Sequence, residues 1–147
     1  MKTYYLYLID DDIAKKYYGR GFMLFDLFSR FVNSHSLTEK KILYKQIQYV
    51  TKPLQTLRLH HRIGYGLACR GDYKREKDMH FLRLESGETG KLTIKKRYVK
   101  IETDGSFEVE TTFFEILRKN ELTFLAMNYE SNQCGWLNPL KKERRYV

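Results

Sequence analysis

The densest apolar run of the chain lies between residues 107 and 139, and it contains the only tryptophan. Within it, Thr123–Tyr129 is centred on four consecutive apolar residues, which predicts a central strand of a sheet. Before this strand, Thr112 and Glu115 have the spacing of a capping box, which predicts a short helix that begins at Thr112 and ends near Asn120. We interpret the stretch as scaffold, because it contains no nucleophile motif or metal motif.

The N-terminal part predicts a strand followed by helices. Tyr4–Ile9 is an aromatic and aliphatic run, typical of a buried strand, and three aspartates follow it. The aspartates favour the start of a helix from about Asp11 to Gly19. Glycines on both sides of Arg20 interrupt that helix, and a stronger one is expected to reach about Val32.

The first helix carries apolar residues on two faces. Ala14 and Tyr18 share one face, whereas Ile13, Tyr17 and Arg20 share another at spacings of i, i+4 and i+7. Two interpretations are open: both faces pack in the core, or one packs in the core and the other contacts a partner.

The region after residue 33 predicts further helices. Ser36 and Glu39 form a second capping box, and apolar residues keep helical spacing as far as Val50. Residues 45–51 also alternate between apolar and polar, so periodicity alone does not decide between helix and strand there. Pro53 suits the first turn of another helix, one side of which carries Leu54, Leu57, His61 and Tyr65.

From Met79 the apolar spacing changes from helical to alternating. Residues 86–90 are typical of a hairpin turn, and Asp104-Gly105 is the strongest hairpin signal in the chain. The three cations at 95–97 shift the phase of the alternation, which indicates a turn or a bulge. We therefore predict an antiparallel meander from about 79 to 110.

The resulting order is strand, helices, meander, helix, strand. It predicts an α+β fold with a mainly antiparallel sheet and helices packed on it, in a single domain spanning residues 1–147. This order resembles that of acetyltransferases that use acyl-CoA, in which a glycine-rich turn before the last helix binds pyrophosphate. The corresponding residues, Phe107–Thr112, contain no glycine and two glutamates, so the acyl-CoA motif is missing and an active or degenerate acyltransferase remains a minor alternative.

The net charge of +9 favours an acidic partner, either a nucleic acid or an acidic protein face, although a basic surface also serves solubility alone. A basic nucleic-acid-binding protein is therefore an alternative function. The basic clusters match no recognised nucleic-acid module, and we expect no direct nucleic-acid contact. They lie at Arg58–Arg62, Lys74–Lys77, Lys95–Lys100 and Lys141–Arg145.

Other functional classes find little support. Cys69 and Cys134 are too few and too far apart for a metal motif, and His60 and His61 would point about 100° apart on a helix. We expect no catalytic residues, no metal and no cofactor, and for His60 and His61 a surface or core role. The N-terminus lacks a secretory pattern and no run spans a bilayer, so we expect a cytoplasmic protein without a membrane contact.

Three blocks, in the same order, resemble the sporulation inhibitor of replication family, SirA. The C-terminal block comprises residues 113–119, 124–127 and 135–139 with the basic tail, the N-terminal block comprises Tyr4–Ile9 and Tyr17–Arg20, and the third is Lys45–Tyr49. The resemblance runs nearly end to end and is weakest between about 62 and 98.

The resemblance implies a non-enzymatic inhibitor of replication initiation in endospore-forming Bacillales. It implies binding to the N-terminal domain of the replication initiator DnaA, by a monomer that forms a heterodimer with it. The implied contact surface joins the first helix to the Lys45–Tyr49 block and comprises Ile13, Lys16, Tyr17, Arg20, Gln46 and Gln48. Ile13 stands where the family carries an aromatic residue.

Overall fold

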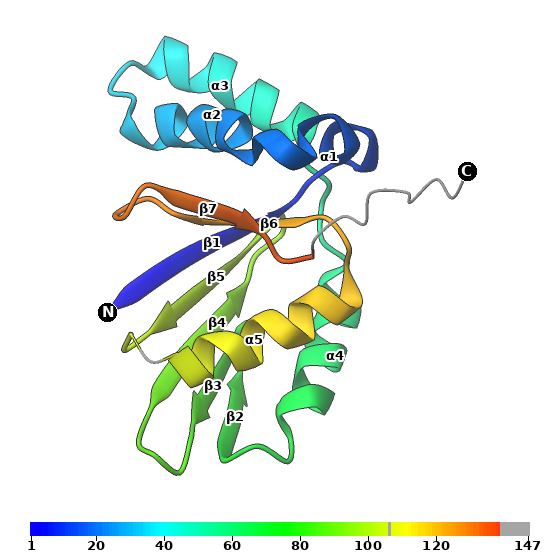
Figure 1. The fold of residues 1–147 in the computed structure, drawn as a ribbon, viewed down its shortest axis with the longest axis vertical. Coiled ribbons are helices and arrows are strands. Elements are labelled where there is room, and N and C mark those ends of the chain that lie inside the picture. Colours follow the sequence, from blue (N-terminus) through cyan, green and yellow to red (C-terminus); the bar gives the residue numbers. More distant parts are fainter. Residues whose placement is uncertain (106, 139–147) are drawn as a thin grey trace, which may run out of the picture.

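The computed structural model describes residues 1–105 and 107–138, and within them the order of elements confirms the α+β prediction. Helices and an antiparallel sheet form one α+β unit (Figure 1). The elements are β1 (Lys2–Leu8), α1 (Asp11–Tyr17), the 3₁₀ turn η1 (Tyr18–Arg20), α2 (Gly21–Asn33), α3 (Leu37–Val50), α4 (Thr56–Leu67), β2 (Asp72–Glu76), β3 (Met79–Arg83), β4 (Thr89–Ile94), β5 (Tyr98–Thr103), α5 (Phe107–Asn120), β6 (Phe124–Asn128) and β7 (Gln133–Trp136).

The sheet has the strand order β2-β3-β4-β5-β1-β6-β7 among the described residues, and neighbouring strands are antiparallel. The first strand lies in the middle, where Leu6 pairs with Val99 of β5 and with Ala126 of β6. The predicted central strand is confirmed, because every residue of β6 is buried.

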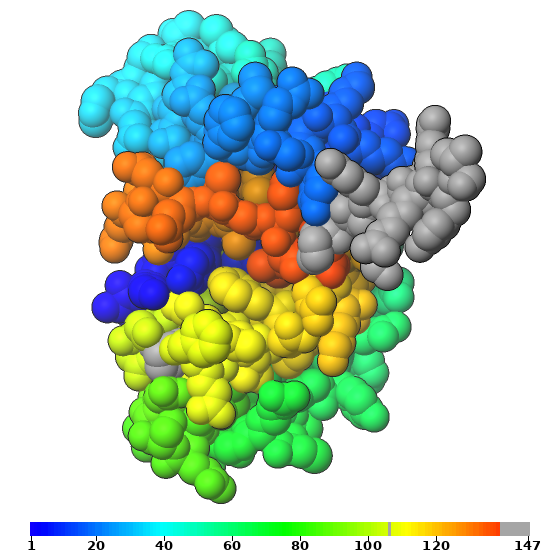
Figure 2. Space-filling model, viewed as in Figure 1, coloured from blue at the N-terminus to red at the C-terminus, as the bar shows by residue number. Residues whose placement is uncertain are grey.

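Helices cover both faces of the sheet. Alternate residues of β1 point to opposite faces: Leu6 and Leu8 join a core with α4 and α5, whereas Tyr7 and Ile9 pack with α1, α2 and α3. Figure 1 shows these two helical groups on opposite sides of the strands. In the space-filling view, the β6–β7 hairpin lies between α2 and α5 (Figure 2).

The prediction that a hairpin forms at Asp104-Gly105 is wrong. The meander ends at Thr103, and α5 already begins at Phe107 instead of Thr112. Gly105 has a positive φ of 96°, which favours glycine and gives the chain a sharp turn into the helix. The Thr112 hydroxyl donates to the carbonyl oxygen of Glu108 at 2.8 Å, as a residue inside a helix does, and so it cannot cap the helix start.

The residues that we compared with the pyrophosphate-binding turn therefore belong to a helix. The connection from β5 to α5 contains Gly105 and the carboxylate of Asp104, which accepts a hydrogen bond from the Thr89 backbone at 3.1 Å.

The structure decides the ambiguity at 45–51 in favour of a helix as far as Val50. Thr51 then leaves the helix and forms an isolated bridge with Ile9. The capping prediction for this helix is confirmed, because the Ser36 hydroxyl accepts from the backbone N–H of Glu39 at 3.3 Å.

The helix predicted from Pro53 begins three residues later, at Thr56. Its predicted side carries Leu57, His61 and Tyr65, and this side faces solvent, with 84% of both Leu57 and Tyr65 exposed. The buried side is formed by Leu59, His60, Ile63 and Leu67.

The sequence pattern missed the edge strands β2 and β7. Four of the five residues of β2 are exposed, so the strand shows no apolar alternation. The C-terminal basic cluster, Lys141–Arg145, lies outside the described residues.

Candidate partner-binding groove

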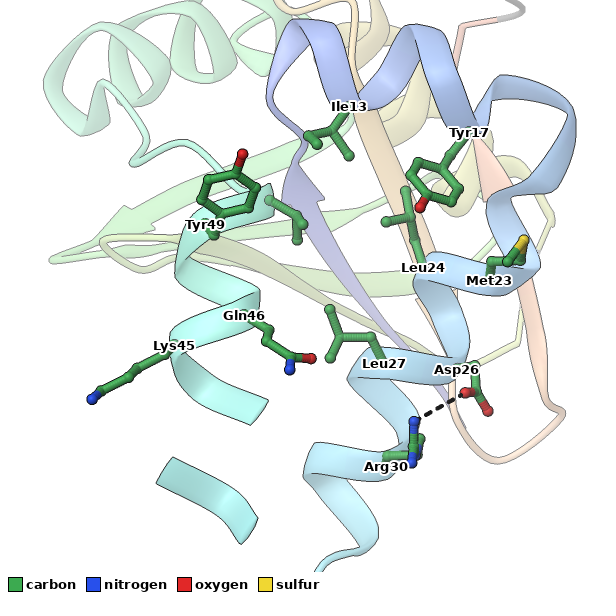
Figure 3. Close-up of a pocket in the computed structure, with 11 residues that line it drawn as sticks. Ile13, Tyr17, Met23, Leu24, Asp26, Leu27, Arg30, Lys45, Gln46 and Tyr49 are labelled. Atoms are coloured by element: carbon green, nitrogen blue, oxygen red, sulfur yellow. Dashed lines mark ion pairs between the residues drawn. The ribbon is translucent and has the colours of Figure 1, made fainter. Parts of the chain in front are cut away.

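A groove of about 480 Å³ lies between α1, α2 and α3. Figure 3 shows the side chains that the three helices contribute to it. They are Ile13 and Tyr17 from α1, Met23, Leu24, Asp26, Leu27 and Arg30 from α2, and Lys45, Gln46, Tyr49 and Val50 from α3.

The first helix is fixed at its start and on its inner face. Asp10 caps α1 by accepting from the backbone N–H groups of Asp12 and Ile13, at 3.1 and 3.3 Å. Ala14 is fully buried, so this face packs in the core. The opposite face is left partly open, because Ile13 and Tyr17 are only half-buried. The structure thus favours the interpretation in which the two faces of α1 differ.

Trp136 of β7 contacts the turn η1, which connects α1 to α2. Its Nε1–H donates to the carbonyl oxygen of Tyr18 at 2.9 Å. A Cβ atom on Gly21, the first residue of α2, would lie 3.2 Å from this nitrogen, so glycine suits the close approach. A strand from the C-terminal part of the chain therefore sets the position of the N-terminal helices.

Aromatic and aliphatic side chains line most of the groove. The ring of Tyr49, which is 77% exposed, stands across from Ile13, and Gln46 points toward Leu27 of α2 (Figure 3). Tyr17 is oriented by Arg20, whose guanidinium carbon lies 5.4 Å from the centre of the tyrosine ring. Arg20 is itself held by a 2.9 Å hydrogen bond to the carbonyl oxygen of Lys16.

Charges lie at the edge of the groove. Asp26 and Arg30 form an ion pair of 3.8 Å in which both side chains are largely exposed, so it contributes little to stability. Lys45 is exposed on the α3 side of the groove, and Lys16 and Arg20 are exposed on α1 and its 3₁₀ extension without lining the groove.

The structure brings Ile13, Tyr17 and Gln46 together in the groove, with Lys16 and Arg20 exposed on the same helix and its 3₁₀ extension. It does not bring Gln48 there. Two residues along a helix correspond to a rotation of about 200°, so Gln48 lies on another side of α3 from Gln46. The backbone carbonyl of Gln48 accepts from Arg97 at 3.2 Å.

Our sequence prediction missed Met23, Leu27 and Tyr49. Tyr49 stands three residues after Gln46 and thus shares its face of α3, a signal that helical spacing could have supplied. Met23 and Leu27 join the groove only because α2 packs beside α1 and α3.

The histidines form a second polar cluster, away from the groove. Buried His60 of α4 lies 2.8 Å from buried His80 of β3 (Nδ1 to Nε2), and the Tyr73 hydroxyl lies 2.6 Å from His80 Nδ1. Burial, and then the nearby His60, lower the pKa of His80 to about 4. The contacts among His60, His80 and Tyr73 link α4 to the sheet. His60 therefore has the core role and exposed His61 the surface role that we predicted.

Neither a metal cluster nor a membrane-spanning helix occurs in the described part of the chain. No group of three or more His, Cys, Asp or Glu side chains in residues 1–105 and 107–138 is placed to hold a metal ion. None of the helices within these same ranges is long and apolar enough to cross a membrane.

Comparison with known families matches residues 2–141 to the model described as "Sporulation inhibitor of replication protein SirA". The chain belongs to the SirA family. A curated SirA of Bacillus subtilis (strain 168), named "Sporulation inhibitor of replication protein SirA", is 37% identical, and the match covers 99% of each chain. The resemblance inferred from three blocks is confirmed. The SirA match includes α1, α2 and α3, so the whole groove lies within it.

Proposed function

We propose that this protein inhibits the initiation of DNA replication during sporulation by binding the N-terminal domain of DnaA in the groove between α1, α2 and α3. The name of the Bacillus subtilis relative supports the inhibitory role. The observation that carries the choice of surface is the groove itself, where Ile13 and Tyr17 of α1 and Tyr49 of α3 present apolar area to solvent.

Tyr17 is the principal anchor of the proposed interface. A tyrosine buries a large area on binding and keeps a hydroxyl for a hydrogen bond, at a low cost in side-chain entropy. The contact with Arg20 favours this orientation of the ring before a partner arrives, which reduces the ordering needed on binding. Ile13 supplies a smaller apolar contact, and the Gln46 amide offers hydrogen bonds to exposed backbone.

Lys16, Arg20 and Lys45 favour an acidic partner face. Exposed charges at the rim of an interface act mainly on the association rate, and their effect falls as salt increases. We propose that the protein acts as a cytoplasmic monomer that occupies one face of the DnaA domain in a heterodimer, a mechanism that needs no catalytic group and no cofactor.

The test is isothermal titration of the isolated DnaA N-terminal domain with the full-length chain and its variants. Tyr17→Ala should weaken binding by about 1–3 kcal/mol, because truncation removes a central aromatic anchor. Tyr65→Ala is the matched control, since Tyr65 is 84% exposed on α4, outside the groove, and its loss should leave the affinity unchanged.

Two glutamine variants locate the contact more closely. Gln46→Ala should weaken binding more than Gln48→Ala, since only Gln46 lines the groove. If Tyr17→Ala and Gln46→Ala both fold and bind like the unmodified protein, the groove is not the binding surface. If a pull-down with DnaA fragments retains none of them, the proposed partner is wrong.

A further inference from the structure

A second cavity, of about 390 Å³, lies on the other side of α3 from the groove, between that helix and the sheet. It is lined by Tyr7 of β1, Phe31 of α2, Tyr44 and Ile47 of α3, the turn residues Lys95, Lys96 and Arg97, and Tyr98 of β5. Its volume falls in the usual range for small-ligand sites, about 300–1,000 Å³. Tyr44 and Ile47 do not line the groove, so the two sites use different faces of the helix.

Aromatic rings from four different elements surround this cavity. The rings of Tyr7 and Tyr98 are 5.5 Å apart, and those of Phe31 and Tyr44 are 5.9 Å apart, measured between ring centres. Burial raises the pKa of Tyr7 to about 12, so its hydroxyl stays protonated and can donate at neutral pH. Within residues 1–105 and 107–138, no hydrogen bond occupies the hydroxyls of Tyr7, Tyr44 or Tyr98.

Cations from one turn line the same cavity. Arg97 uses Nη2 to contact the carbonyl oxygens of Gln48 and Thr51, at 3.2 and 3.4 Å, but its Nε is buried and has no hydrogen-bond partner in the described part of the chain. Lys95 is paired with Asp78 at 3.0 Å, whereas Lys96 is exposed and forms no ion pair with a described residue. Lys96 and Arg97 thus place positive charge at the cavity wall, where the exposed Lys96 ammonium can pair with an anionic group of a ligand.

The walls of the cavity are already fixed without a ligand. The backbone N–H of Lys95 donates to the carbonyl oxygen of Tyr98, and that of Leu54 donates to the carbonyl oxygen of Lys96, both at 2.9 Å. Arg97 also donates to the carbonyl oxygens of Gln48 and Thr51 at the end of α3. The turn at 95–97 is therefore fixed both by its backbone and by this side chain. A preformed site loses little conformational entropy when it binds.

We propose that this cavity binds a small aromatic anion, namely a single planar ring that carries a phosphate or a carboxylate. The ring packs among the tyrosines and Phe31, while the anionic group pairs with the Lys96 ammonium beside the guanidinium charge of Arg97. An inorganic anion would leave the aromatic walls uncovered, and a neutral ring would leave the Lys96 ammonium without a counter-charge.

The experiment titrates the full-length chain with phenyl phosphate and follows binding by NMR chemical shifts and calorimetry. Phenyl phosphate should saturate the site with a Kd of about 1 mM or lower, and phenol and inorganic phosphate should each bind at least about tenfold more weakly. Benzoate, measured in parallel, distinguishes a site for aromatic carboxylates from one that requires a phosphate.

Variants identify the cavity as the binding site. Tyr44→Ala and Lys96→Ala change partly or fully exposed side chains, and each should weaken binding of phenyl phosphate by about threefold to tenfold. Tyr49→Ala, on the groove side of the same helix, is the matched control and should bind phenyl phosphate normally. The proposal fails if phenyl phosphate does not saturate by about 10 mM, if inorganic phosphate binds equally well, or if neither cavity variant weakens binding.

Discussion

Replacing Gly90 with alanine tests how closely α5 packs on the sheet. Gly90 lies in β4 directly beneath α5, and a Cβ atom placed on it would clash with Val109 Cγ1 and lie 3.0 Å from Phe113 Cε2. Carbon atoms prefer a separation of about 3.5–4.0 Å. Val109 and Phe113 are both fully buried in the core, so neither can turn into solvent to make room.

The expected cost follows from these contacts. Adding a methyl group to a filled core costs about 1–3 kcal/mol, and replacing glycine by alanine gives back about 0.4–1 kcal/mol by restricting the unfolded chain. Gly90→Ala should therefore lower the free energy of unfolding by about 1–2 kcal/mol. The groove is formed by other elements, so affinity for the DnaA domain should not change where the variant is fully folded.

The assay is urea unfolding followed by circular dichroism. Gly135→Ala is the control, since Gly135 is an exposed glycine of β7 with no atom of another described group within 4 Å of the added carbon. It should show only the gain from restricting the unfolded chain, at most about 1 kcal/mol, and no loss of stability. Val109→Ala removes the main obstacle, so the double variant should be more stable than the sum of the two single effects predicts, by at least about 1 kcal/mol. Additive effects, or a Gly90→Ala variant as stable as the unmodified protein, would refute the packing argument.

Three further predictions concern acid stability, the corner of the groove and the affinity for the partner. In His80 the folded pKa of about 4 lies below the unfolded value of 6.5, so the unfolded chain takes up the proton first and stability falls as the pH drops from about 6.5 to 4. Urea unfolding should be easier by about 2 kcal/mol at pH 5 than at pH 7, and His80→Gln should lose most of this difference. The remainder arises from carboxylates and from His60, whose pKa also responds to the charges of Arg75 and Asp78, while the Tyr73 hydroxyl contacts His80 itself. Trp136→Phe loses the bond to Tyr18, so thermal unfolding should show about 1 kcal/mol less stability, and unchanged stability would mean that this bond contributes nothing. Ile13→Phe should bind the DnaA domain more tightly in calorimetry by up to about 1.5 kcal/mol, because a ring adds aromatic contacts in the groove, and weaker binding would indicate that the pocket on the partner is too small.

Elements with complete local signals were predictable from the sequence. The run Phe124–Met127 is apolar at every position, as a strand between β1 and β7 must be. Asp10 and Ser36 combine a capping side chain with a following amphipathic segment, and both cap a helix. In these cases the local preference and the tertiary environment agree.

The error at Asp104-Gly105 shows what the local sequence leaves undetermined. This dipeptide specifies a sharp turn but not the type of element after it, and the next residues fit alternation over a few positions as well as a helix. The helix is selected because Val109, Phe113 and Leu117 then all face the core at once. That choice depends on β4, which is distant in sequence. The edge strand β2 was missed for a related reason, because pairing with β3 stabilises it without burying its side chains.

The candidate groove was predictable in part. Helical spacing alone assigns Ile13 and Tyr17 to one face of α1, and Ala14 to the other. The contribution of Met23 and Leu27 depends on how α2 crosses its neighbours, and no spacing within α1 or α3 contains that information. The contact between His60 and His80 is of the same kind, since twenty residues and a change of element separate the two rings.

The C-terminal hairpin explains how a groove made from the first third of the chain keeps its shape. The helix α1 is only seven residues long, and isolated helices of that length are not stable in water. It is held by the Asp10 cap, by buried Ala14 and, through Tyr18, by Trp136 of β7. Because β7 pairs with β6 next to the central strand β1, the sheet fixes the corner from which Tyr17 projects. The apolar C-terminal stretch therefore supports the proposed interface although none of its residues lines the groove.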